Sequence, residues 1–239
     1  MTSNFAFEPA DAAASSSPVS PSGAPMPIPA EGAQASGLAA AQLRARISGG
    51  QLAPGLKLSE QTIARELGVS RNTLREAFTV LAGESLVDRV PNRGVFVARP
   101  TADDVREIYS ARRIIEPGAV LWGSCPSEVL TELSAVIAAA RSAREAGDIK
   151  GMGDANQRFH RGLMALTGSD TLVTTMDRLL ARMRLVFHSM SADPDFHGDY
   201  VDRNADLLRL LQAGQRAEAA EVLRDYLTFA EAQLLENMA

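Results

Sequence analysis

The amino-acid sequence predicts a mainly helical protein in which a winged helix-turn-helix unit precedes a larger all-helical bundle. Near residue 70, two short helical patterns are joined by a three-residue turn, and a strand-turn-strand pattern follows them. From Thr101 onward, apolar residues recur at steps of three and four, with no alternating strand pattern. The charge is divided in the same way: residues 37–99 hold nine bases and five acids, whereas residues 100–239 hold 15 bases and 21 acids.

The composition of the whole chain sets limits on its class. With 239 residues, 46% of them hydrophobic and 22% charged, the chain can bury a sizeable core. No apolar run approaches the roughly 20 residues of a membrane helix, so we expect no membrane partner and no secretion. One cysteine, Cys125, excludes an intramolecular disulfide and a cysteine-based zinc cluster, and it fits a reducing cytoplasm. The net charge of −5 hides the basic segment, whose excess of bases indicates nucleic-acid binding unless it is a chance fluctuation.

Three domains are expected. The composition of residues 1–36 predicts a disordered leader, because 24 of them are Ala, Ser, Pro or Gly and none is Lys or Arg. Residues 37–100 form the predicted DNA-binding unit, and residues 101–239 form the helical domain.

The elements of the basic segment follow from apolar spacing and capping residues. Helical spacing runs from Leu38 to Ile47 and ends at two glycines. Ser59 and Ser70 are suited to cap two further helices, and Gly68 supplies the left-handed position between them. The expected elements are helices over 38–47, 60–67 and 71–82, and strands over 86–90 and 95–97 around a turn at 91–94.

The first turn of the third helix has the composition of a DNA-reading surface. A helix that enters the major groove presents its N-terminal residues to the bases, where Arg binds guanine and Asn binds adenine. At the wing tip, Gly94 permits close approach to DNA and Arg93 could enter the minor groove. The candidate contacts on the helix are Ser70, Arg71, Asn72, Thr73 and Arg75. The alternative is an ordinary exposed helix whose arginines pair only with Glu76 or water.

This segment resembles a known family. The stretch LRARISGGQLAPGLKLSEQTIARELGVSRNTLREAFTVLAGESLVDRVPNRGVFVARP is similar to the winged helix-turn-helix of GntR-family bacterial transcription regulators. The resemblance implies binding to double-stranded operator DNA as a homodimer, with Arg71, Thr73, Arg75 and Gly94 among the contacts. Where the family often has an arginine early in the second helix, this chain has Gln61, which is a further candidate contact.

Turn signals divide the remainder into six helical segments, which predicts a bundle of six or seven helices. Polar residues on the apolar stripes could converge on a cavity that holds a small effector. These candidates are Arg112, Asn156, His160, Asn204 and Tyr226. The alternative is that they satisfy one another in the core, with Arg112 paired to Glu116. His188 and His197 are expected at the surface.

The bundle sequence resembles the FCD effector domain of FadR-like regulators in DVREIYSARRIIEPGA, NQRFHRGLMALTGS and ADLLRLLQAGQRAEAAEVLRDYL. Many members bind a divalent metal through one Asp and three His. The corresponding positions here are Asn156, His160, Asn204 and Tyr226, so only His160 matches. We therefore expect that the metal site is lost and that no cofactor binds. A cavity containing Arg112 suits a small organic acid, the class of effector that the resemblance implies.

The predicted function is a bacterial transcription regulator, a repressor by the commoner behaviour of the family, whose operator affinity responds to the effector. The alternative is a regulator of the same family that needs no effector or responds to metal. An enzyme built on His160 and Asp154 is a third reading. The chain has no Gly-rich phosphate loop, nucleophile elbow or Cys/His pair, so we predict no catalytic residues.

Overall fold

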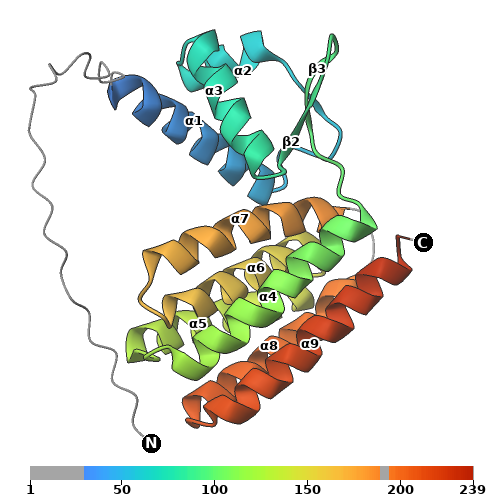
Figure 1. Ribbon diagram of the computed structural model, residues 1–239. Coiled ribbons are helices and arrows are strands. Elements are labelled where there is room, and N and C mark those ends of the chain that lie inside the picture. The colour runs from blue at the N-terminus through green and yellow to red at the C-terminus, as the bar shows by residue number, and fades with distance from the viewer. Residues whose placement is uncertain (1–29, 189–193, 239) are drawn as a thin grey trace, which may run out of the picture.

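The computed structural model describes residues 30–188 and 194–238 of the chain (Figure 1). Within these residues it contains nine helices and three short strands, which confirms the mainly helical class. Most of the predicted leader lies outside the described residues. We call residues 30–100 the head and residues 101–238 the bundle.

The first helix of the head, α1 (Ala30–Ser48), is longer than predicted. It starts inside the predicted leader, so residues 30–36 are helical. Alanine is the strongest helix former, and it occurs three times in residues 30–35. Ser36, Ala39 and Ala40 are also buried, so packing in the head supports a helix that apolar periodicity alone places further along the chain.

The helix-turn-helix has the expected bounds, with α2 at Glu60–Leu67 and α3 at Arg71–Gly83. The Ser70 hydroxyl accepts a hydrogen bond from the backbone N–H of Thr73 at 3.0 Å, and Ser59 caps α2 in the same way. Gly68 ends α2 with φ 66°, a left-handed conformation that costs glycine little. The three-residue turn thus fixes the direction in which α3 leaves α2.

The wing is a three-stranded antiparallel sheet in the order β1-β3-β2. The strands β2 (Val87–Val90) and β3 (Gly94–Val97) form the predicted hairpin. The strand β1 (Lys57–Leu58) was not predicted, because two residues show no periodicity. It pairs Lys57 with Phe96 and so brings another base to the hairpin.

The bundle consists of α4 (Ala102–Trp122), α5 (Ser127–Glu145), α6 (Ile149–Ala165), α7 (Asp170–Phe187), α8 (Pro194–Gln212) and α9 (Arg216–Glu236). These are the six predicted segments, except that α8 starts inside the turn expected at 191–198. Proline at the first position of a helix explains this difference, because its missing N–H is not needed there. No helix among the described residues is long and apolar enough to cross a membrane.

The head rests on the bundle through α1 and α7, which lie side by side (Figure 1). Ala181 and Leu185 of α7 are buried among the core residues of the head. The Glu84 carboxylate at the end of α3 accepts two hydrogen bonds from Arg44 of α1, each 2.7 Å long, and pairs with Arg178 of α7 at 3.3 Å. The head and α7 are therefore joined by a buried apolar contact and by an ion pair.

Candidate nucleic-acid interface and bundle core

The first turn of α3 presents its polar side chains to solvent. Arg71, Asn72 and Arg75 are exposed, while Thr73 is half-buried beside its capping partner Ser70. Among the described residues Arg71 forms no ion pair. The Arg71 guanidinium is therefore available to a phosphate or a base.

The side chains next to Arg71 do not form the arginine–Glu76 pair that was the alternative from the sequence. The Arg75 Nε donates to the Glu60 carboxylate of α2 at 2.9 Å rather than to Glu76. Glu76 instead accepts a hydrogen bond from the Asn72 amide at 3.0 Å. Both contacts are at exposed positions and are weak enough to exchange for contacts with DNA. Gln61, on the first turn of α2, is also exposed.

The tip of the wing is basic. Arg93 and Gly94 are exposed, and Gly94 has φ 108°, which favours glycine. The Arg93 guanidinium and the Lys57 ammonium each lie 5.9 Å from the centroid of the Phe96 ring. Sequence analysis missed Lys57, because nothing in the local pattern places residue 57 beside residue 96. In Figure 1 the hairpin points away from the bundle.

The polar residues predicted on the inner faces of the bundle converge on one hydrogen-bonded chain. Arg112 Nε donates to Glu116 at 2.5 Å, and the other Glu116 oxygen lies 2.6 Å from Nδ1 of His160. The Tyr226 hydroxyl lies 3.2 Å from His160 Nε2 and 3.1 Å from Asn156 Oδ1, so its one proton can be donated to only one of them at a time. The last member of this hydrogen-bonded network is Asn204, whose side-chain amide donates to Asn156 Oδ1 at 2.8 Å.

The charged members of this hydrogen-bonded network compensate one another. Burial opposes ionisation of Glu116, but Arg112 and His160 hold its pKa at about 2. Burial is also the largest influence on His160 and lowers its pKa, against the opposing effect of Glu116. At neutral pH, Arg112 and Glu116 are therefore a charged pair beside a neutral imidazole.

The donor set does not fit the divalent metal that the resemblance to the FCD domain implies. His160 is the only imidazole in this hydrogen-bonded network of described residues, and both of its nitrogens already have partners. The one carboxylate, Glu116, is paired with Arg112. The buried Asn204 Oδ1 has no hydrogen-bond partner among the described residues, but an amide oxygen is a poor ligand for zinc or nickel.

The expectation for one of the two other histidines was wrong. His188 is exposed as expected, but His197 of α8 has only 4% of its surface exposed. Its ring meets Phe187 of α7 edge to face, with centroids 5.6 Å apart. The Pro/Gly/Asp-rich surroundings suggested a surface loop, whereas α8 already begins at Pro194 and carries His197 against α7.

Two family models match the chain. Residues 36–97 match the bacterial regulatory proteins of the gntR family, and residues 107–229 match the FCD domain. A transcriptional regulator GntR from Rhodococcus sp. RHA1, known from its crystal structure, is 37% identical. The match covers 85% of this chain and 98% of that chain, with a TM-score of 0.75.

Curated relatives match over shorter stretches. A helix-turn-helix type regulator in an unstable DNA locus of Streptomyces ambofaciens is 35% identical over 130 residues, covering 53% of each protein. The gluconate operon transcriptional repressor of Bacillus licheniformis is 35% identical over 100 residues, covering 41% of each. The chain thus spans about half the length of these relatives.

Proposed function

Because this chain belongs to the GntR family of transcriptional regulators and carries an FCD domain, we propose that it is a repressor whose release from DNA is controlled by a small organic acid. It acts as a homodimer on operator DNA in the cytoplasm and catalyses no reaction. The similarity to the repressor of the gluconate operon supports the repressor part of this proposal.

The exposed first turn of α3 is the observation that carries the DNA-binding mechanism. Arg71 is free to bind a guanine in the major groove, and Asn72 can exchange Glu76 for an adenine. The Ser70 and Thr73 hydroxyls and Gln61 suit phosphate contacts, as does Arg75 once it leaves Glu60. On the wing, Arg93, Gly94 and Lys57 are the residues that we propose for contacts with the minor groove or the adjacent backbone.

The experiment is a fluorescence anisotropy titration of a duplex selected from genomic fragments. Arg71→Ala should weaken binding by about 1–3 kcal/mol, or roughly five- to 150-fold, because one base contact is lost. The matched control is Arg224→Ala on α9, which removes another exposed arginine far along the chain. Equal affinity of the two variants would refute the role of Arg71.

The exposed face of α4 supports a homodimer. Ile114 and Trp122 are 76% and 87% exposed, and Gly118 lies midway between them on the same face. A side-chain carbon added at Gly118 would meet nothing within 4 Å, so another helix can approach closely. A second copy of this chain is the occupant we propose, because helix-turn-helix proteins read two half-sites with two recognition helices.

We also propose that the bundle core works without a metal. In place of a metal centre, the core has the ion pair of Arg112 and Glu116 beside the neutral His160. The hydrogen bonds of this group with Asn156, Asn204 and Tyr226 hold the helices α4, α6, α8 and α9 together. The metal-responsive alternative predicts that zinc or nickel at stoichiometric concentration raises the melting temperature.

A further inference from the structure

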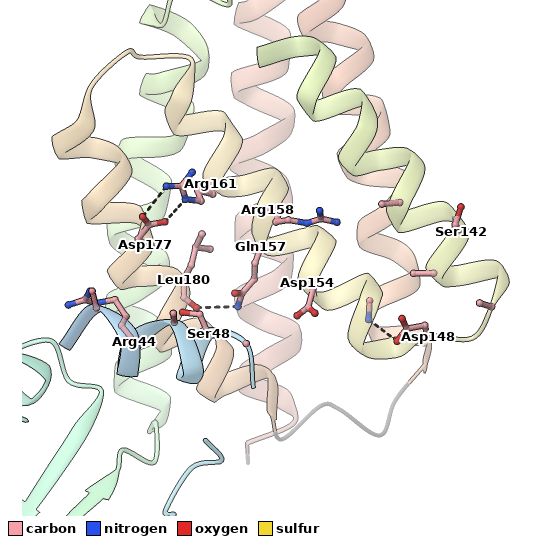
Figure 2. Close-up of a pocket in the computed structure, with 17 residues that line it drawn as sticks. Arg44, Ser48, Ser142, Asp148, Asp154, Gln157, Arg158, Arg161, Asp177 and Leu180 are labelled. Carbon is pink, nitrogen blue, oxygen red and sulfur yellow. Dashed lines mark hydrogen bonds and ion pairs between the residues drawn. The ribbon is translucent and has the colours of Figure 1, made fainter. Parts of the chain in front are cut away.

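A large groove lies between the head and the bundle (Figure 2). Its volume is about 1030 Å³, which is at the upper end for sites of small organic ligands. One wall is α1 and the other is α5, while α6 and α7 form the floor. The apolar part of the lining is made of small side chains and one leucine: Ala41, Ala45, Ala139, Ala143, Ala146 and Leu180.

The cations of the groove lining are paired, with one exception. Arg44 is bound by Glu84, and Arg161 donates two hydrogen bonds to Asp177 at 2.7 and 3.3 Å. Arg158 also lines the groove, is exposed, and forms no ion pair within the described part of the chain. Figure 2 shows its side chain extending from α6 toward the α5 side.

Two of the three carboxylates of the lining are held by other cations. Asp177 is held by Arg161, and Asp154 pairs with Lys150 at 2.6 Å and with Arg184 at 2.8 Å. Asp148 caps α6 by accepting a hydrogen bond from the Gly151 N–H at 2.9 Å. Among the described residues, the groove therefore offers one cation without an ion-pair partner, and most of its apolar surface lies on the walls, on the alanines of α1 and α5.

The lining also contains a buried polar group that can accept a hydrogen bond. Gln157 is 9% exposed and its Nε2 donates to the Leu180 carbonyl at 3.1 Å, which fixes the amide. The Gln157 Oε1 has no hydrogen-bond partner among the described residues and remains available to a hydroxyl or amide of a ligand.

The bundle core is less suited to an anion than the groove is. Arg112 was the predicted charge partner of an organic acid, but its guanidinium is already paired with the Glu116 carboxylate at 2.5 Å. Both side chains are almost fully buried. A carboxylate that entered the core would have to displace Glu116 or lie beside it, and both cost several kcal/mol.

We propose that the groove is the effector site, and that it binds an amphipathic organic anion with its acid group on Arg158 and its apolar body on the alanines of the two walls. This inference rests on the proposed function, which supplies the class of effector, and it moves the site from the bundle core to the boundary of the head. Because α1 belongs to the head and α5 to α7 belong to the bundle, the ligand contacts both bodies at once. It therefore favours one position of the head over another.

The probe for this site is 8-anilinonaphthalene-1-sulfonate, an apolar anion that fluoresces when it leaves water. Titrated into the full chain without DNA, it should saturate. Arg158→Ala should weaken its binding at least about tenfold, because a charge-assisted hydrogen bond is lost. Arg224→Ala is the matched control and should stay within about twofold. Equal affinity of the two variants would overturn the role of Arg158.

Two further variants locate the site. Ala45→Leu on α1 fills the groove from the wall of the head without touching the core, and it should abolish binding of the probe. Tyr226→Phe removes one hydroxyl from the bundle core and should leave the affinity for the probe unchanged. The reverse result, loss in Tyr226→Phe with full binding in Ala45→Leu, would place the anion in the core and overturn the proposal.

The regulatory role is tested with the selected duplex. The probe should change the Kd for the duplex by about fivefold or more in the unmodified chain and leave it unchanged in Ala45→Leu. A chain that binds DNA but shows no saturable binding of the probe would refute only the groove. Failure to bind any duplex would refute the proposed function itself.

Discussion

Glu116→Gln would remove the carboxylate that compensates Arg112 in the bundle core. The glutamine has nearly the same shape and still offers hydrogen bonds, so the main change is electrostatic. The Arg112 guanidinium, 2% exposed, would remain buried without a counter-charge. We expect a large loss of stability, because an uncompensated buried charge is far more costly than a missing hydrogen bond.

The magnitude follows from two independent estimates. Arg112 and His160, against the opposing effect of burial, bring the pKa of Glu116 from 4.5 to about 2. At about 1.4 kcal/mol for each pH unit, this difference corresponds to about 3 kcal/mol of stabilisation in the ionised state. Removing one partner of a buried ion pair costs about 3–5 kcal/mol in general. We therefore expect Glu116→Gln to cost about 3 kcal/mol or more.

The assay is urea unfolding of the full chain at pH 7, followed by circular dichroism. The control is the double variant Arg112→Met/Glu116→Leu, which removes both charges and should cost much less than Glu116→Gln, since apolar replacements of a buried pair are often tolerated. A loss below about 1 kcal/mol in Glu116→Gln, or a double variant that is less stable than the single one, would refute the reasoning.

Four further outcomes are expected. Gly68→Ala should lower the free energy of unfolding by about 1 kcal/mol in urea, because the backbone φ of Gly68 is 66°. Gly83→Ala, at a glycine without positive φ, should not destabilise the protein, and equal effects of the two variants would contradict this reasoning. Trp122→Glu should convert a dimer into a monomer in light scattering, and an unchanged mass would exclude the α4 face. Stability should fall as the pH drops below 6.5, because burial lowers the pKa of His160 and only the unfolded chain takes up the proton there. His160→Gln should reduce this loss. Zinc or nickel at stoichiometric concentration should leave the melting temperature unchanged, and a clear rise would restore the metal-responsive alternative.

Local features of the fold could be predicted from the sequence because their causes are local. Ser59, Gly68 and Ser70 act within one turn of the residues they cap, so the bounds of α2 and α3 followed from the spacing. The bundle helices followed from apolar periodicity and from glycine and proline between the segments. The inward direction of Arg112 and Asn156 has the same origin, since the period of the helix decides which side chains share a face.

The pairing of Arg112 with Glu116, four residues apart, was one of the two alternatives open from the sequence, but partners from distant segments could not be predicted in this way. His160 and Glu116 are 44 residues apart, and Arg44 and Glu84 are 40 apart; neither pair has a local signal. The two residues of β1 form a strand only because β3 supplies their hydrogen bonds, which is how Lys57 reaches the wing. The burial of His197 likewise depends on how α8 packs against α7.

The sequence by itself determined which side chains lie on which face of each helix. It predicted arginines at the exposed start of a capped recognition helix and polar residues on the inner faces of a bundle. Only the tertiary structure decided what these groups meet. It set His160 of α6 against Glu116, whose pairing with Arg112 the spacing within α4 already allowed, and it left Arg158 without an ion-pair partner among the described residues, in a groove between α1 and α5. The physical reason is that helix period and capping act within a few residues, whereas charge compensation and cavities depend on packing between segments that are distant in the chain.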